Sequence, residues 1–233
     1  MNTRGLLDQL LKSGQELLQQ KAAGKSGGHS GGKSGNGNLG SLLTGAGGGA
    51  LAAGALGLLL GNKSARKMGG KALTYGGLAA LGVLAYKAYG NWQAQQAAAP
   101  QGEPQTLDRL PAPQAEQHSQ AILKALVAAA KADGHVDARE RQLIEEELAK
   151  LTQDAELRRW LDAELNKPLD PADVARAATT PEMAAEMYLA SVLMVDEEHF
   201  MERAYLEELA RQLRLDPGLK AELERQVRQQ LVS

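Results

Sequence analysis

Two acidic segments in the second half of the chain contain the residues best suited to binding a metal ion or to catalysis. The first is AKADGHVDARERQL, residues 130–143, and the second is MVDEEHFMERAYL, residues 194–206. Each continues an apolar helical pattern, so Asp133 and Asp196 fall near the carboxyl ends of predicted helices. A negative charge is disfavoured there, because the helix macrodipole leaves that end negative. A bound cation would offset this cost, which makes the two acidic corners a candidate metal site.

Ordinary helix capping accounts for part of the same pattern. Asp137 is placed as an N-cap with Glu140 three residues later, which is a capping-box arrangement that needs no ligand. The first corner is not an EF-hand, since Ile144 stands where the loop requires a bidentate glutamate. A hard cation such as Ca²⁺ or Mg²⁺ between the corners stays open, and so does a softer metal bound through His135 and His199. Solvated, metal-free helix ends are the alternative.

The two corners also resemble each other as copies of one unit. When ALVAAAKADGHVDARERQLIEEELAKL is set beside YLASVLMVDEEHFMERAYLEELARQLRL, Asp133 matches Asp196. With one deletion, Glu140 then matches Glu202. Both copies read as helix, acidic corner and helix, which indicates an internal pseudo-repeat.

The helical pattern extends through the second half of the chain. Apolar residues recur at helical spacing from residue 118 onward, and no stretch alternates with period two for long enough to be a strand. Residues 118–233 are therefore predicted to form a compact all-α domain of about seven helices. Helix starts are expected at Asp154 and at the pairs Asp170-Pro171, Thr180-Pro181 and Asp216-Pro217.

Charge and glycine divide the 233-residue chain into two unlike halves. Residues 1–92 contain 10 Lys and Arg against 2 Asp and Glu, whereas residues 93–233 contain 16 against 26. Of the 26 glycines, 23 lie in the first 92 residues. The absence of cysteine excludes disulfides, iron–sulfur clusters and thiolate zinc sites. The front's basic residues flank apolar runs and are not interleaved with aromatics, which favours a lipid bilayer over nucleic acid as partner.

The front half is predicted to associate with a membrane. Residues 1–23 read as an amphipathic helix, and residues 24–38 as a Gly/Ser linker. Residues 39–61 are 23 consecutive uncharged positions, which is long enough to cross a bilayer. A flexible low-complexity stretch is the alternative for that run. Small residues recur in it every four positions and would let helices pack closely in lipid; they are Gly45, Gly49, Ala53, Gly57 and Gly61.

A second apolar run, residues 72–92, is the better candidate for a span because aromatic residues lie near both of its ends. Residues 39–92 are thus predicted to be a membrane region with one firm span and a glycine-rich partner. The basic residues at 63–71 would stay cytoplasmic, which sends the acidic domain outward if the second run spans and keeps it inside if only the first does. Residues 93–117, rich in Pro, Gln and Ala, read as a tether.

Three segments carry a resemblance to a known family: LLLGNKSARKMGGKALTYGGLAALGVLAYKAYGNWQ, KADGHVDARE and ERAYLEELARQLRLDPGL. The chain resembles the YebE-like inner-membrane proteins of Gram-negative bacteria, whose C-terminal part is a TerB-like (tellurite-resistance) domain. The resemblance implies an inner-membrane location, an all-helical domain and no established enzymatic activity. It also implies a metal site shared by the two half-repeats, although the second corner lacks the ADG form of the first. The acidic residues that the resemblance assigns to that site are Asp133, Asp137, Glu140, Asp196 and Glu202.

Three functions agree with these patterns. The preferred one is a non-enzymatic, membrane-anchored adaptor or sensor in envelope or metal stress, which binds a divalent cation through the acidic corners. It would bind a protein partner or self-associate, the latter through the glycine stripe. The second is a structural protein that organises membrane and uses its acidic domain as a docking surface. The third is a metal-dependent hydrolase, which needs both corners to face one cleft with an open coordination position.

Overall fold

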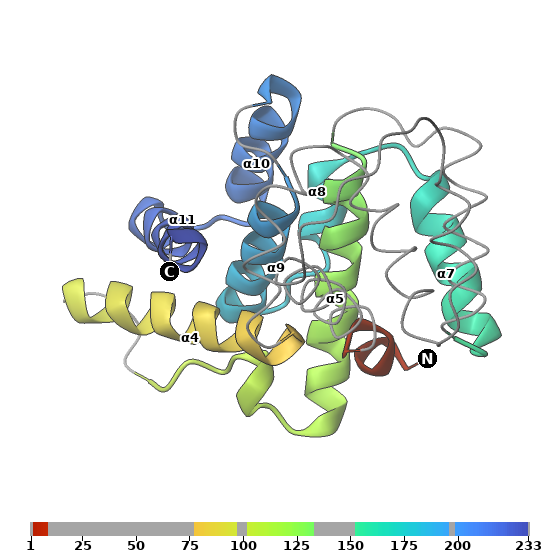
Figure 1. Ribbon diagram of the computed structural model, residues 1–233, viewed down its shortest axis with the longest axis horizontal. Coiled ribbons are helices and arrows are strands. Elements are labelled where there is room, and N and C mark those ends of the chain that lie inside the picture. The colour runs from red at the N-terminus through yellow and green to blue at the C-terminus, as the bar shows by residue number, and fades with distance from the viewer. Residues whose placement is uncertain (1, 9–76, 97–101, 133–151, 196–198, 233) are drawn as a thin grey trace, which may run out of the picture.

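The computed structural model describes residues 2–8, 77–96, 102–132, 152–195 and 199–232, and it confirms the predicted all-α class. Every regular element in these ranges is a helix (Figure 1). Residues 3–8 form a short first helix. The other elements are α4 (Gly77–Gln95), η2 (Leu107–Arg109), α5 (Ala112–Ala130), α7 (Ala155–Asn166), α8 (Pro171–Ala175), α9 (Pro181–Met194), α10 (Phe200–Gln212) and α11 (Pro217–Val232).

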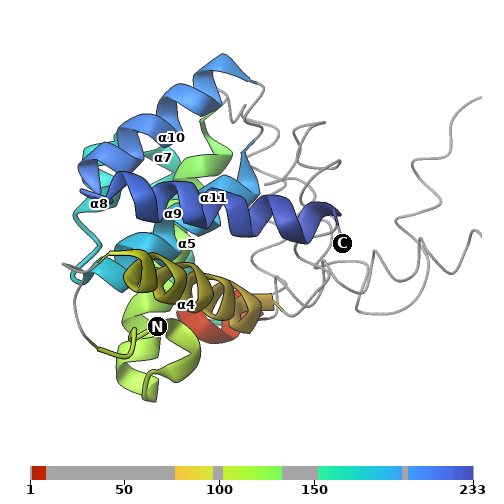
Figure 2. The same ribbon diagram turned by 90° about the vertical axis from the view of Figure 1, so that its left-hand side faces the viewer.

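Helix α9 is the centre of the body. Its start is set by Thr180, whose hydroxyl accepts a hydrogen bond from the backbone N–H of Met183 at 3.1 Å, and by Pro181, which is suited to the first helical turn. Every residue from Met183 to Val192 is buried. The reason is that α4, α5, α10 and α11 surround this helix (Figures 1 and 2). A helix that is covered on all sides has no polar face, so its sequence is nearly continuously apolar.

Helix α4 overlaps the second predicted span, residues 72–92, and packs in the same core. Its buried side chains lie against α9 and α11. Within the described ranges, no helix is long and apolar enough to cross a membrane, so the predicted span at 72–92 is not confirmed. The run at 39–61, with Gly45, Gly49, Gly57 and Gly61, lies outside the described residues. The buried residues of α4 are Leu81, Leu84, Ala85, Ala88 and Tyr89, together with Gly82.

The close approach of α4 to η2 depends on a glycine. A Cβ atom at Gly82 would lie 2.7 Å from Oδ1 of Asp108 and 3.0 Å from its backbone nitrogen. Gly90, on the same helix, has no atom within 4 Å of the corresponding position. Of these two glycines of α4, Gly82 is the one whose missing side chain lets the helix touch another element.

The short first helix also docks on the body. Leu6 and Leu7 are 3 % and 0 % exposed, so part of the predicted amphipathic face is covered by protein. The carboxylate of Glu116 in α5 accepts hydrogen bonds from the backbone N–H groups of Thr3 at 2.5 Å and Arg4 at 3.1 Å. An anion at this helix end is favoured by the macrodipole. Residues 9–38, which include the predicted linker, lie outside the described residues.

The segment predicted as a tether, residues 93–117, is partly helical. Helix α4 continues to Gln95, η2 forms at Leu107–Arg109, and α5 begins at Ala112, ahead of the expected domain start at residue 118. The compact body therefore includes α4, η2 and the first turns of α5 as well as the helices expected from the sequence.

Candidate functional site

The carboxyl ends of α5 and α9 lie at the same end of the body. The two helices pack side by side and run in the same direction (Figures 1 and 2). Helix α5 ends at Ala130 and α9 at Met194, which confirms that Asp133 and Asp196 follow helix ends closely in the chain. Each helix end carries about half a negative charge. Two such ends side by side make this part of the protein favourable for a cation.

One of the five predicted metal ligands is placed by the structure. Glu202 lies in the first turn of α10 and is only 2 % exposed, although it is charged in water at neutral pH. The amino end of a helix favours a carboxylate, so the location is electrostatically compatible with a negative side chain. The other four, Asp133, Asp137, Glu140 and Asp196, lie outside the described residues.

The metal site therefore stays a prediction. Among the described ranges, no group of three or more His, Cys, Asp or Glu side chains is arranged to hold an ion. Tyr205, one turn after Glu202 on α10, is a second buried polar residue of this helix. Burial raises the pKa of Tyr205, while the Ser191 hydroxyl acts to lower it.

A buried pair of ionisable side chains lies deeper in the core. His118 of α5 is 5 % exposed and Glu186 of α9 is fully enclosed; Nδ1 of the former lies 2.5 Å from Oε2 of the latter. The other oxygen of Glu186 accepts the backbone N–H of Leu107 at 2.5 Å. Burial raises the pKa of Glu186, while the hydrogen bonds from His118 and Leu107 act to lower it. Because η2, α5 and α9 enclose this pair, it joins three elements and has no access to a substrate.

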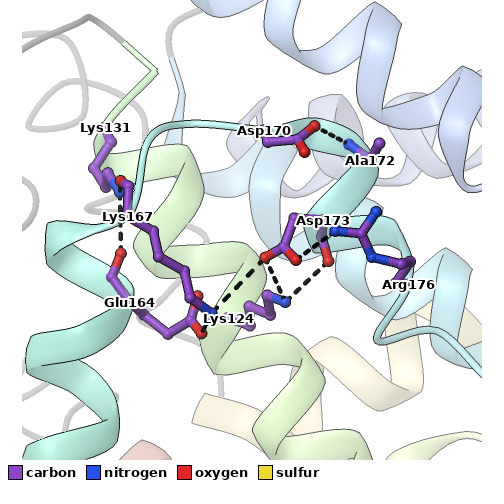
Figure 3. Close-up of polar contacts among 8 residues, drawn as sticks. All are labelled: Lys124, Lys131, Glu164, Lys167, Asp170, Ala172, Asp173 and Arg176. Atoms are coloured by element: carbon purple, nitrogen blue, oxygen red, sulfur yellow. Dashed lines mark hydrogen bonds and ion pairs between the residues drawn. The ribbon is translucent and has the colours of Figure 1, made fainter.

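A cluster of basic side chains joins α5, α7 and α8 (Figure 3). Asp173 of α8 accepts from Nζ of Lys124 at 2.8 Å and from Nη2 of Arg176 at 2.7 Å, and Nζ of Lys167 lies 4.0 Å away. The hydrogen bond from Lys124, followed by that from Arg176, lowers the pKa of Asp173 to about 2. Two cations thus contact one carboxylate directly, and a third, Lys167, lies nearby.

Two lysines of the same cluster complete the carboxyl end of α7. Nζ of Lys131 donates to the backbone carbonyl of Glu164 at 3.0 Å and also to that of Lys167 (Figure 3). The Lys167 ammonium in turn pairs with the Glu164 carboxylate. Cations at a helix carboxyl end satisfy carbonyls that have no partner within the helix. This part of the cluster has a structural explanation.

A groove of about 880 Å³ adjoins the cluster through Arg176. Tyr89 and Trp92 of α4 and Leu219 of α11 form part of its apolar lining. The indole Nε1 of Trp92 donates to Oδ1 of Asp216 at 2.8 Å, which holds the ring at the wall. The polar lining includes Arg176 of α8, Arg211 at the end of α10, and Arg214 in the turn before α11.

Sequence reasoning missed both the groove and the buried pair. The three arginines belong to segments about 35 residues apart (Arg176 versus Arg211 and Arg214), and no local pattern relates them. A signal for the buried pair did exist, since Glu186 is the one charged residue in the apolar run 183–195. A lone carboxylate in such a run indicates a buried partner, because an unpaired buried charge is costly.

Comparison with known proteins gives a family but no activity. A family model described as "Protein of unknown function (DUF533)" matches residues 45–227. The chain is similar to a curated protein of Yersinia enterocolitica described as "Uncharacterized protein in ampR 5'region". The two are 34% identical over 114 residues, which cover 49% of this chain and 82% of the relative. No solved structure matches the chain.

Proposed function

The chain belongs to the DUF533 family, which is TerB-like, and we propose that it is a non-enzymatic helical adaptor or sensor that binds a divalent cation. The proposed site is the shared carboxyl end of α5 and α9. The observation that carries this proposal is the parallel packing of those two helices, each followed within three residues by an aspartate. Two negative helix ends with further carboxylates beside them are unfavourable without a compensating positive charge.

The described residues fit a hard cation in part. Glu202 is a buried oxygen donor in the helix that follows the second corner, and Ca²⁺ and Mg²⁺ are bound by such oxygens. In the proposal, Asp133, Asp137, Glu140 and Asp196 supply the remaining oxygens.

The proposal also retains a bacterial inner-membrane location. Its support is the uncharged run at 39–61 and the basic residues that follow it, which precede α4 by a few residues. A membrane anchor formed by that run would connect to the body at the start of α4. The glycine stripe would mediate self-association in the bilayer. A compartment-specific reporter fused after residue 233 decides on which side of the membrane the body lies.

The cation is tested on the full-length chain in detergent micelles by calorimetric titration with Ca²⁺, Mg²⁺, Mn²⁺ and Zn²⁺. One of these ions is expected to bind saturably and to raise the melting temperature, since an ion at 100 times its Kd stabilises by about 2.7 kcal/mol. Glu202→Gln should weaken binding at least tenfold. Glu207→Gln, an exposed position on the same helix, is the matched control and should change nothing.

Two further results decide the cation proposal. Because Glu202 is buried, its variant is first shown to unfold cooperatively without added metal. The double variant Asp133→Ala/Asp196→Ala then tests the corners themselves. If that variant and the natural chain give the same heats of binding with all four ions, the acidic corners do not bind a cation and this part of the proposed function is wrong.

A further inference from the structure

We propose that the groove between α4, α8, α9 and the α10–α11 turn binds an acidic peptide segment of a partner protein. This rests on the adaptor role proposed above and names the chemistry of the partner. The groove is lined by Thr180 and Pro181 at the amino end of α9, whereas the proposed cation site is at the carboxyl ends of α5 and α9, so cation binding and peptide binding are separate properties.

The charge of the groove is opposite to that of the domain around it. Residues 93–233 contain 16 Lys and Arg against 26 Asp and Glu, a net charge of −10. The groove, however, is lined by Arg176, Arg211 and Arg214 and by one acidic residue, Asp216. The hydrogen bond from Trp92 lowers the pKa of Asp216, whose Oδ1 also accepts the backbone N–H of Gly218 at 2.8 Å. The single carboxylate is thus occupied by the fold and leaves the arginines in excess.

The positive charge is also available for a ligand. Arg176 shares its partner Asp173 with Lys124, so one carboxylate serves two close cations, while Lys167 pairs with Glu164 (Figure 3). Arg211 pairs with Glu208 through two hydrogen bonds on the exposed side of α10, so part of its charge is already offset. Arg214 makes no hydrogen bond or ion pair through its side chain within the described part of the chain.

The backbone at Arg214 is unusual for an arginine. Its φ is 54°, in the left-handed region that favours glycine. The N–H of Leu215 bonds to the carbonyl of Ala210 at 3.1 Å, and that of Arg214 to the carbonyl of Arg211 at 3.1 Å. This is the Schellman motif that ends a helix, and glycine is its usual residue at this position. A guanidinium is therefore kept at the groove where the backbone alone would favour glycine.

The shape favours a peptide over a membrane surface. A bilayer presents a broad surface that does not enter a concave groove, and a small anion would leave the apolar lining uncovered. Trp92 and Leu215 are half-buried in the lining and offer apolar contact area, and the buried ring of Tyr89 supports Trp92 edge to face with ring centroids 5.1 Å apart. A segment with acidic and apolar side chains would cover both parts of the lining.

The test is selection from a library of eight-residue peptides built from Asp, Glu, Lys, Gln, Leu, Phe and Ala. The bait is the full-length chain in uncharged detergent micelles, with Trp160→Phe so that Trp92 is the remaining tryptophan. Peptides with acidic and apolar residues should be enriched, and the best should shift the Trp92 emission. The double variant Arg176→Gln/Arg214→Gln should bind that peptide at least tenfold more weakly.

The matched control is Arg203→Gln/Arg228→Gln, which removes the same charge outside the groove and should change the affinity less than twofold. Arg214→Gly separates folding from binding. It should leave the melting temperature unchanged or raised while it lowers the affinity for the peptide. No acidic enrichment, or equal losses in the two double variants, would overturn the proposal. A second result would also overturn it. If phosphatidylglycerol added to the micelles shifts the Trp92 emission more than the peptide does, and Arg176→Gln/Arg214→Gln abolishes that shift, the groove binds lipid headgroups.

The two proposals fail separately. If no acidic peptide binds while the cation heats depend on the acidic corners, the groove proposal alone is wrong. If peptides bind but no ion does, the adaptor role remains and the cation does not.

Discussion

Replacing Glu186 by leucine is expected to destabilise the fold by about 2–6 kcal/mol, because it leaves two buried hydrogen-bonding groups without a partner. The side chain is fully enclosed and accepts two hydrogen bonds, one from Leu107 N–H and one at Nδ1 of His118, both at 2.5 Å. Leucine has a similar volume, so little of the effect comes from a cavity. Each buried group left without a partner costs about 1–3 kcal/mol, which gives this range for the two groups.

A loss of this size is a large share of the about 5–15 kcal/mol that holds a typical domain folded. Urea unfolding of the full-length chain, followed by circular dichroism, measures it. Glu207→Leu on exposed α10 surface is the matched control and should stay within about 0.5 kcal/mol of the natural chain.

A double-variant cycle then separates the energy of the His118–Glu186 interaction from the effects of changing each side chain alone. His118→Leu/Glu186→Leu removes both partners, so it should cost clearly less than the sum of the two single changes. A loss below about 1 kcal/mol for Glu186→Leu, against the about 1–3 kcal/mol expected for even one stranded group, would refute the role given to this pair.

Three other predictions concern the packing of the body. Gly82→Ala should destabilise by about 1–3 kcal/mol because its Cβ meets η2 at 2.7 Å, whereas Gly90→Ala, with open space around it, should stabilise by about 0.5–1 kcal/mol; equal effects in urea unfolding would contradict the close approach. Asp173 has a folded pKa of about 2 against an ordinary 3.8, so its contribution is present above pH 3.8 and is lost as the pH falls toward 2. At 31 % exposure, solvent screening reduces that contribution to about 1 kcal/mol, and Asp173→Asn should remove this part of the acid dependence. Glu116→Gln should weaken the docking of residues 2–8 and speed proteolysis near the amino end, with unchanged cleavage counting against the docked helix.

The helix starts were predictable from the sequence because capping is local. Asp154 accepts the N–H groups of Glu156 and Leu157 at 3.0 Å each, and Asp170 accepts that of Ala172 at 2.9 Å. In each case the donor lies two or three residues from its acceptor, so the residue types alone announce the bond. The positions of Asp133 and Asp196 just beyond helix ends follow from where the apolar helical pattern stops.

The apolar pattern of a helix, by contrast, does not show whether lipid or protein covers it. The run at 72–92 has the composition of a membrane span, and its described part, α4, buries its apolar side against α9 and α11. Lipid and a protein core are both apolar, so a single segment satisfies either. The choice depended on the faces of other helices far away in the chain.

The groove was decided by tertiary structure alone. Arg176 and Arg214 line the same groove because α8 packs against α10. Trp92 lines it too because α4 packs against α11. The sequence by itself determined the helices, their caps and the division between a basic front and an acidic body. Which charged side chains share a surface, and which pair is enclosed, followed from long-range packing, because side chains distant in the chain come together only when their helices do.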